Sequence, residues 1–161
     1  MSLEFAQTSA SLSWQQSKAN TPFVKTSQGP DAVANNFVWT TGVGGANEVL
    51  TYYLTLAAST HQDIDLQTGT NLLGESVNLV RVYGIQVLPE DGDCVVSPGN
   101  PHGLVWFFGA SSNSVRVPLG GIFNFSNPVA TTVDGTHHTL RFENPSSTAP
   151  VSVKIAIIGG T

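Results

Sequence analysis

Hydrophobic and polar residues alternate along most of this chain. In residues 50–56, every second residue is Leu or Tyr, and two of the residues between them are threonines. In residues 151–157, every second residue is Val or Ile, with Ser152 and Lys154 on the opposite side. A period of two with one polar face is typical of a half-buried antiparallel strand. The spacing of an amphipathic helix is hard to find anywhere in the sequence.

Turn residues divide the alternating segments into short pieces. The chain contains 16 glycines and 9 prolines, which would break most helices before a third turn. The pattern therefore predicts an all-β protein, an antiparallel β-sandwich of about ten short strands, for which a jelly roll is the type that fits best. The predicted strands are residues 23–28, 36–41, 49–57, 61–66, 77–88, 103–109, 114–117, 122–126, 137–143 and 150–158.

The N-terminal residues have a different character. Residues 1–20 are rich in Ser, Gln and Ala, and Leu12 and Trp14 are isolated among them. We predict an extended N-terminal arm over residues 1–20, followed by a single β-sandwich domain over residues 21–161.

The charge composition limits the classes of function. The chain contains 6 Lys and Arg and 11 Asp and Glu, so charged residues make up 11% of it. Ordinary soluble domains contain about 25%. Six scattered cations cannot form the basic surface that nucleic-acid binding requires. No apolar stretch is long enough to span a membrane. With no recognisable secretion signal and a single cysteine, Cys94, we expect synthesis in the cytoplasm.

Two groups of acidic residues resemble metal sites. His61, Asp63 and Asp65 lie on one face of a predicted strand, but alternate strand residues are about 6.6 Å apart, too far for three groups to bind one ion unaided. Glu90 to Asp93 resembles a calcium loop, yet it lacks the spacing and the final Glu of an EF-hand. We expect a solvated strand face and a hydrophilic hairpin tip, and no metal or cofactor.

Catalytic motifs are also absent from the sequence. His137 and His138 are adjacent on a predicted strand and point to opposite sides, so they cannot chelate one metal. Cys94 has no basic neighbour and is expected to be a small buried apolar residue. No strained Gly-x-Ser-x-Gly turn is present, and Gly42–Gly45 and the sequon at Asn124 carry no further signal. We predict no catalytic residues and no enzymatic activity.

Aromatic residues are the more informative group. Trp106 to Phe108 would place large rings on both faces of one predicted strand. Such rings belong to a doubly covered core strand, to a subunit interface, or to a platform on which sugars stack. The sequence leaves these alternatives open. The residues that we predict for a possible interface are Leu12, Trp14, Phe23, Trp39, Tyr53, Trp106 and Phe108.

From Tyr53 onward, the order of segments resembles a family of small β-proteins encoded among the virion genes of tailed bacteriophages. The resemblance covers roughly two-thirds of the chain, and the Pro-rich segment 88–102 lies outside it. The segments that carry the resemblance are Leu54–Thr60, Asp63–Leu66, Leu73–Gly74, Val80–Val87, Phe107–Ser111, Val117–Phe123, Arg141–Asn144 and Val151–Thr161.

This resemblance implies a structural virion protein of the jelly-roll-like capsid decoration or cement type. Its expected partners are the major capsid protein or other virion proteins, and further copies of itself, with a trimer suited to the three-fold positions of a capsid. It implies no catalytic residue. Two alternatives remain, a lectin-like glycan-binding module that uses Trp14, Trp39 and Trp106, and a minor tail or fibre-associated protein.

Overall fold

The computed structural model describes residues 5–10, 35–40, 46, 48–70 and 74–161, and of residues 5–10 and 35–40, Phe107 and Pro128 it describes the backbone only. Within these residues the only helix is one 3₁₀ turn, so the prediction of an all-β protein is confirmed. The elements are β1 (Phe5–Ala10), β2 (Asn35–Thr40), β3 (Glu48–Leu56), β4 (His61–Asp65), β5 (Gly69–Thr70), β6 (Ser76–Val77), β7 (Arg81–Pro89), β8 (Cys94–Pro98), η2 (Trp106–Phe108), β9 (Val115–Val117), β10 (Phe123–Thr132), β11 (Thr139–Glu143) and β12 (Val151–Gly160).

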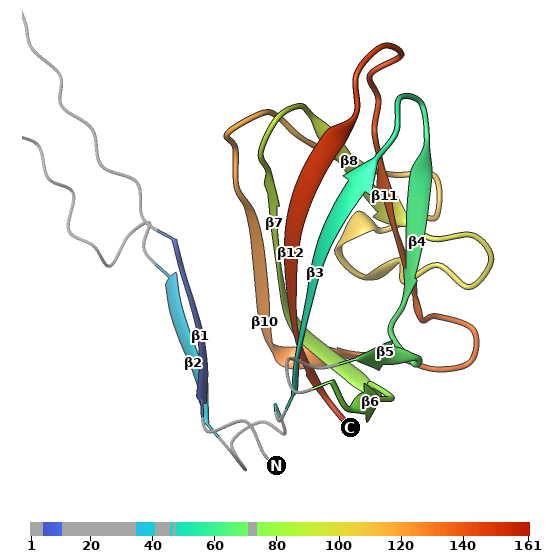
Figure 1. Ribbon diagram of the computed structural model, residues 1–161. Coiled ribbons are helices and arrows are strands. Elements are labelled where there is room, and N and C mark those ends of the chain that lie inside the picture. Colours follow the sequence, from blue (N-terminus) through green and yellow to red (C-terminus); the bar gives the residue numbers. More distant parts are fainter. Residues whose placement is uncertain (1–4, 11–34, 41–45, 47, 71–73) are drawn as a thin grey trace, which may run out of the picture.

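Two four-stranded sheets form the body of the molecule (Figure 1). One has the order β10-β7-β12-β3, and the other has the order β4-β11-β8-β9. Every pairing in both sheets is antiparallel. The short strands β5 and β6 pair with each other as a separate two-stranded sheet. The result is sandwich-like, with the two larger sheets lying against a common core.

The core contains side chains from both four-stranded sheets in one continuous cluster. On β12, Val153, Ile155 and Ile157 are all buried, while Lys154 between them is exposed. The alternation predicted for residues 151–157 is therefore confirmed, as is that of β3 and β11. Each of these strands carries an apolar inner face and a polar outer face, because successive side chains point to opposite sides of the sheet.

Asn144 is the one fully buried polar side chain among the described residues. Its Nδ2 atom donates hydrogen bonds to the carbonyl oxygens of Leu56 (3.1 Å), Ala57 (3.1 Å) and Ala149 (2.8 Å), and its Oδ1 accepts one from the Ser146 N–H (2.9 Å). Leu56 is the last residue of β3, Ala57 follows it, and Ala149 lies in the connection before β12. Asn144 thus fastens together the β3–β4 and β11–β12 connections, both of which join one sheet to the other.

The strand predicted over residues 103–109 is wrong. Trp106–Phe108 form η2, and Gly109 ends it with a left-handed backbone (φ 76°). Trp106 packs edge-on against Phe125, with 4.7 Å between ring centroids, and Phe108 is buried. The rings therefore do not lie on two faces of one strand. Aromatic residues favour strands because they pack well on a pleated surface. Here the rings reach the core from a 3₁₀ turn, which explains why the prediction of a strand failed.

The sequence analysis missed strand β8, which lies in the Pro-rich segment 88–102. Cys94, Val96 and Pro98 are buried and the two residues between them are half-buried, so the strand carries the usual alternation. Pro98 is its last residue, a position where a missing N–H does not interrupt the ladder. Strand β10 is also longer than the predicted 122–126, and its pairing with β7 shifts register between Ser126 and Thr131.

The described part of the N-terminal region contains an antiparallel pair of strands. Strand β1 pairs with β2, and the two form a ribbon beside β10, outside the two four-stranded sheets (Figure 1). Residues 5–10 of the predicted arm are therefore a paired strand, and β2 confirms the strand predicted over residues 36–41. The strand predicted over residues 23–28 lies outside the described residues.

Candidate functional site

Polar side chains gather on the outer face of the β4-β11-β8-β9 sheet. Antiparallel register places Asp63 opposite Arg141 and His61 opposite Glu143 on neighbouring strands, and Ser97 of β8 stands beside Arg141. On β8 and β11 these positions alternate with buried residues, and on β4 Asp63 is followed by buried Ile64. A pleated strand with an apolar inner face must present its polar residues outward, so the core alternation itself creates this row.

An ion pair stands at the centre of this face. Arg141 donates two hydrogen bonds to Asp63, from Nε to Oδ1 at 2.8 Å and from Nη2 to Oδ2 at 2.9 Å. Both side chains are about three-quarters buried, with 23% and 28% of their surface exposed. The hydrogen bond from Arg141 lowers the pKa of Asp63, against the opposing effect of partial burial. The pair is therefore ionised across the physiological pH range.

A second contact lies next to it. His138 Nδ1 is 3.0 Å from Asp65 Oδ1, and the His138 ring stacks on the ring of His102 with 5.2 Å between centroids. Partial burial raises the pKa of Asp65, but hydrogen bonds from the Gln67 N–H and from His138 outweigh burial and lower it. These contacts tie β4, β11 and the loop after β8 together.

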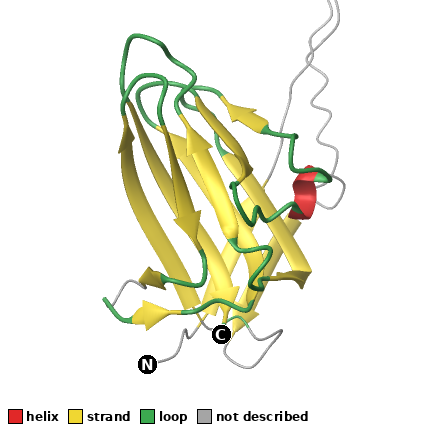
Figure 2. Ribbon diagram, turned by 90° about the vertical axis from the view of Figure 1, so that its right-hand side faces the viewer, coloured by secondary structure: helices red, strands yellow, loops and turns green. Residues whose placement is uncertain are grey.

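A pocket of about 500 Å³ opens on this polar face. Its floor is formed by Val95 and Ser97 of β8 and by Arg141 and Glu143 of β11. One wall is the loop over residues 98–103, and the other contains Ser111, Ser112 and Ser114. Figure 2 faces this side of the molecule and shows loops crossing in front of the strands, with η2 (red) at their right-hand edge. The volume lies within the usual range for small-molecule sites, roughly 300 to 1,000 Å³.

The first wall is held firmly against β11. The Gly99 N–H donates to the Thr139 carbonyl (3.0 Å), and the Thr139 hydroxyl donates to the Pro101 carbonyl (2.8 Å). A Cβ atom on Gly99 would lie 2.3 Å from the Thr139 hydroxyl oxygen, and one on Gly103 would lie 2.4 Å from the Gly99 carbonyl oxygen. Only glycine allows this close approach, so both glycines are needed for the shape of the wall.

The residues considered for metal binding have other contacts. Asp63 and Asp65 are engaged with Arg141 and His138, and His61 is exposed. In the β7–β8 turn, Asp91 accepts hydrogen bonds from the backbone and hydroxyl of Ser152, and Asp93 pairs with Arg116. Within the described residues, no group of three or more His, Cys, Asp or Glu side chains could hold a metal ion.

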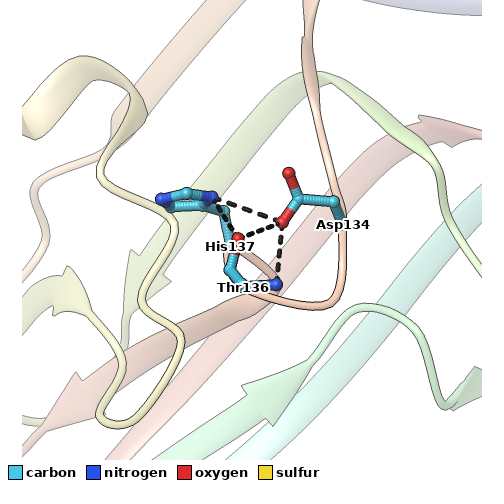
Figure 3. Close-up of polar contacts among 3 residues, drawn as sticks. All are labelled: Asp134, Thr136 and His137. Carbon is cyan, nitrogen blue, oxygen red and sulfur yellow. Dashed lines mark hydrogen bonds and ion pairs between the residues drawn. The ribbon is translucent and has the colours of Figure 1, made fainter.

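Asp134, Thr136 and His137 form a cluster that resembles a catalytic arrangement (Figure 3). Asp134 Oδ1 accepts hydrogen bonds from the Thr136 N–H (2.8 Å) and hydroxyl (2.7 Å), and it lies 3.3 Å from His137 Nδ1. The hydroxyl also lies 2.9 Å from the same Nδ1 atom. A catalytic histidine holds the acid and the nucleophile on different ring nitrogens. Since both meet Nδ1 here, the cluster stabilises an exposed turn, and the hydrogen bonds from Thr136 lower the pKa of Asp134 to about 2.

Cys94 is fully buried in the common core. Burial raises the pKa of its thiol to about 11. A thiol that stays protonated is a poor nucleophile. The prediction that Cys94 is a small buried apolar residue is confirmed.

The predicted interface residues have different environments. Tyr53 is 62% exposed on the outer face of β3, with Lys154 Nζ 5.9 Å from the centre of its ring. Phe108 is buried within the core, and Trp106 is half-buried and packs against the core. The side chain of Trp39 on β2 is not described, and Leu12, Trp14 and Phe23 lie outside the described residues.

Exposed apolar side chains occur where the sequence analysis named none. Leu119 (58% exposed) and Ile122 (63%) lie in the turn between β9 and β10, and Val129 (85%) lies where β10 shifts register. These residues lie in a turn and at a register shift, where the alternation of apolar and polar residues does not predict exposure. The pocket was missed for a related reason, since its walls come from loops that lack any period.

Comparison with known proteins identifies no relative: no protein-family model matches the chain, and a search of curated proteins finds no similar sequence. Among the described residues, no helix is long and apolar enough to cross a membrane.

Proposed function

We propose that this protein is a non-enzymatic structural component of a tailed-phage virion, built on a jelly roll, and that it decorates or cements the capsid. Its partners are the major capsid protein or other virion proteins, together with further copies of itself, a trimer being the favoured oligomer. The protein is made in the host cytoplasm and acts on the virion. The family resemblance of residues 53–161 motivates this proposal, and the strand order carries it.

The strand order supports the jelly roll as follows. Counting the eight strands of the two larger sheets in chain order, from β3 as the first to β12 as the last, the pairs are first with eighth, second with seventh, third with sixth and fourth with fifth. This is the pattern of one long hairpin rolled into two sheets. The β12–β7 pairing joins the first and third strand pairs in one sheet, and the β11–β8 pairing joins the second and fourth in the other. Jelly rolls of this kind recur in viral capsid proteins and in lectins.

The exposed apolar side chains supply a contact surface for this role. Leu119 and Ile122 stand three residues apart at the tip of one turn, next to the edge strands β9 and β10. A protein that acts by assembly gains from apolar contacts and from few charges to desolvate. The low charge of the chain, 11% of residues, agrees with that requirement.

Binding to capsids that lack decoration tests the proposal. The purified chain is incubated with such capsids from the phage that encodes it, and co-sedimentation and the temperature of capsid rupture are measured. We expect binding and a higher rupture temperature, and we expect Leu119→Asp with Ile122→Asp to weaken binding without unfolding the protein. Thr51→Asp on the exposed face of β3 is the matched control. A chain that neither binds nor changes rupture would refute the decoration role.

The N-terminal residues offer a second contact. Strands β1 and β2 form a ribbon outside the two larger sheets, which supports a role for residues 1–20 as an arm that meets a neighbouring subunit. Deleting residues 1–20 should abolish association and leave the sandwich folded. Immunogold labelling of virions separates the head from the tail or fibre-associated alternative.

A glycan-binding module is the second candidate function. The tryptophans that motivated it give little support, since Trp106 packs against Phe125 and the side chain of Trp39 is not described. The observation that favours this function is the polar pocket on the outer face of the β4-β11-β8-β9 sheet. A glycan array tests it for the whole chain.

A further inference from the structure

We infer that the pocket between β8, β11 and the loops at 98–103 and 109–114 binds a neutral, polyhydroxylated ligand, of the size and chemistry of a sugar unit. This inference rests on the second candidate function and is independent of the capsid role. It assigns the site, the residues that line it and the charge class of the ligand.

The pocket presents hydrogen-bond donors and acceptors side by side. A guanidinium group has five N–H donors. Arg141 uses two of them on Asp63, and the other three make no hydrogen bond to a described residue. The carboxylate of Glu143, the next outward residue on β11, likewise has no hydrogen-bond partner in the described part of the chain. A sugar hydroxyl both donates and accepts, so adjacent hydroxyls fit a guanidinium and a carboxylate held next to each other.

Hydroxyl groups complete the lining. Ser97 projects from the floor, and Ser111, Ser112 and Ser114 project from the second wall. Val95 and Pro98 are the only apolar side chains among the lining residues. An apolar ligand would gain little in such a pocket and would strip water from these polar groups at a cost. A hydrated, hydroxyl-rich ligand exchanges those waters for equivalent hydrogen bonds.

The charge of the site decides between neutral and anionic ligands. Arg141 is the only Lys or Arg in the lining, and Asp63 already neutralises it at 2.8 Å. Glu143 adds a negative charge to the floor. A phosphate or carboxylate ligand would therefore meet no net positive charge, and repulsion from Glu143 would oppose it. The site suits neutral sugars.

The site is also formed in advance. Asp63 fixes the plane of the Arg141 guanidinium by two hydrogen bonds, and its own carboxyl accepts another from the Asn100 N–H. His102 holds a left-handed backbone (φ 65°), with its carbonyl accepting the N–H groups of both His138 (2.8 Å) and Thr139 (3.0 Å). A non-glycine residue keeps such a conformation only where its surroundings enforce it. Binding thus requires little ordering of these side chains.

Nuclear magnetic resonance of the whole chain tests the inference. The ¹⁵N-labelled protein is titrated separately with glucose, galactose, mannose, rhamnose and N-acetylglucosamine, and with inorganic phosphate and glucuronate as anionic probes. We expect at least one neutral sugar to give saturable shifts of the amides around Ser97, Asn100, Ser112 and Arg141, and both anions to bind more weakly. Ser112→Trp, which fills the pocket from an exposed loop, should abolish those shifts. Glu143→Gln should weaken binding by about tenfold, as expected for loss of a charged acceptor.

Ser147→Trp is the matched control, because Ser147 is exposed in the β11–β12 turn and lies outside the pocket. It should bind as the unchanged chain does. The inference is overturned if no neutral sugar shifts the pocket amides, if Ser112→Trp binds as well as the control, or if the anions bind best. A positive glycan array with unchanged binding by Ser112→Trp would keep the glycan function and remove this pocket from it.

Discussion

The two four-stranded sheets differ in the length of their strands. In the β10-β7-β12-β3 sheet the strands have nine or ten residues, whereas in the β4-β11-β8-β9 sheet they have three to five. At about 3.3 Å per residue, the first sheet is roughly twice as tall as the second. Loops connect the strands of the shorter sheet, and the loops at residues 98–103 and 109–114 form the walls of the pocket.

The outer faces of the two sheets also differ in how their polar side chains are arranged. The long sheet presents exposed polar residues such as Thr51, Thr55 and Gln86, and the ion pair of exposed Lys154 with Glu90. The short sheet presents the half-buried pair of Asp63 and Arg141 under a covering of loops. The pocket and the half-buried bidentate ion pair therefore both belong to the short sheet. The following predictions test this division.

The largest effect is expected from placing a charge on the inner face of the long sheet. Ile155 is 3% exposed, so Ile155→Asp buries an unpaired carboxylate. We expect a loss of about 4 kcal/mol or more in the free energy of unfolding, enough to prevent folding of many domains. Thermal melting followed by circular dichroism measures it, with Thr51→Asp on the outer face as control. An unchanged melting temperature for Ile155→Asp would show that the face assignment is wrong.

The next effect concerns the buried contact between the ends of the two sheets. Asn144→Ala removes the side-chain donor to the buried Leu56 carbonyl and to the Ala149 carbonyl, whereas the Ala57 carbonyl keeps its hydrogen bond from the Thr60 hydroxyl. We expect a loss of about 2 to 4 kcal/mol, measured by urea unfolding. Asn113→Ala is the control, because Asn113 is exposed and makes one side-chain hydrogen bond, to the Phe108 carbonyl. Equal losses in the two variants would argue against a special role for Asn144.

A smaller effect distinguishes the half-buried ion pair from an exposed one. A double-mutant cycle with Asp63→Ala and Arg141→Ala should give a coupling energy of about 1 to 2 kcal/mol, since the pair is bidentate and mostly shielded from solvent. The same cycle on Arg116 and Asp93, where the arginine is 66% exposed, should give less. The reverse order would contradict the view that the short sheet holds its polar groups rigidly.

The smallest effect is on the pH dependence of stability. The folded protein lowers the pKa of Asp63 and of Asp65. Their contribution is therefore present above the unfolded pKa of about 3.9 and is lost as the pH falls through the lower, folded values. We expect the melting temperature to fall as the pH drops below about 4. Asp63→Asn should flatten that decline, and an equally steep decline in this variant would contradict the assignment.

The sequence predicted the long sheet well and the short sheet less well, for a physical reason. Long strands such as β12 repeat the two-residue period enough times to be recognised, and burial of Val153 and Ile155 follows from it. Strand β8 repeats it only twice between turn residues and was missed, although Cys94 and Val96 carried the signal. The turn at Trp106–Phe108 was taken for a strand because aromatic propensity says nothing of tertiary packing.

The candidate site was predictable only in part. Asp63 and Asp65 were recognised as sharing one strand face, but their partners Arg141 and His138 lie more than 70 residues away in the sequence. The pairing of β4 with β11 brings these residues together, and the pairing register of two distant strands cannot be predicted from the sequence pattern alone. The serines of the second wall gave no signal, since loop positions follow no period.

Quantitative mass spectrometry of purified particles of the phage that encodes this chain tests the central proposal, a virion structural role, most directly. The account predicts that the chain is present in the particles at a copy number comparable to that of the major capsid protein. A copy number of only a few per particle would contradict the decoration role and favour a tail or fibre-associated role. Absence from particles, with the chain found only in the soluble lysate, would contradict a virion role altogether.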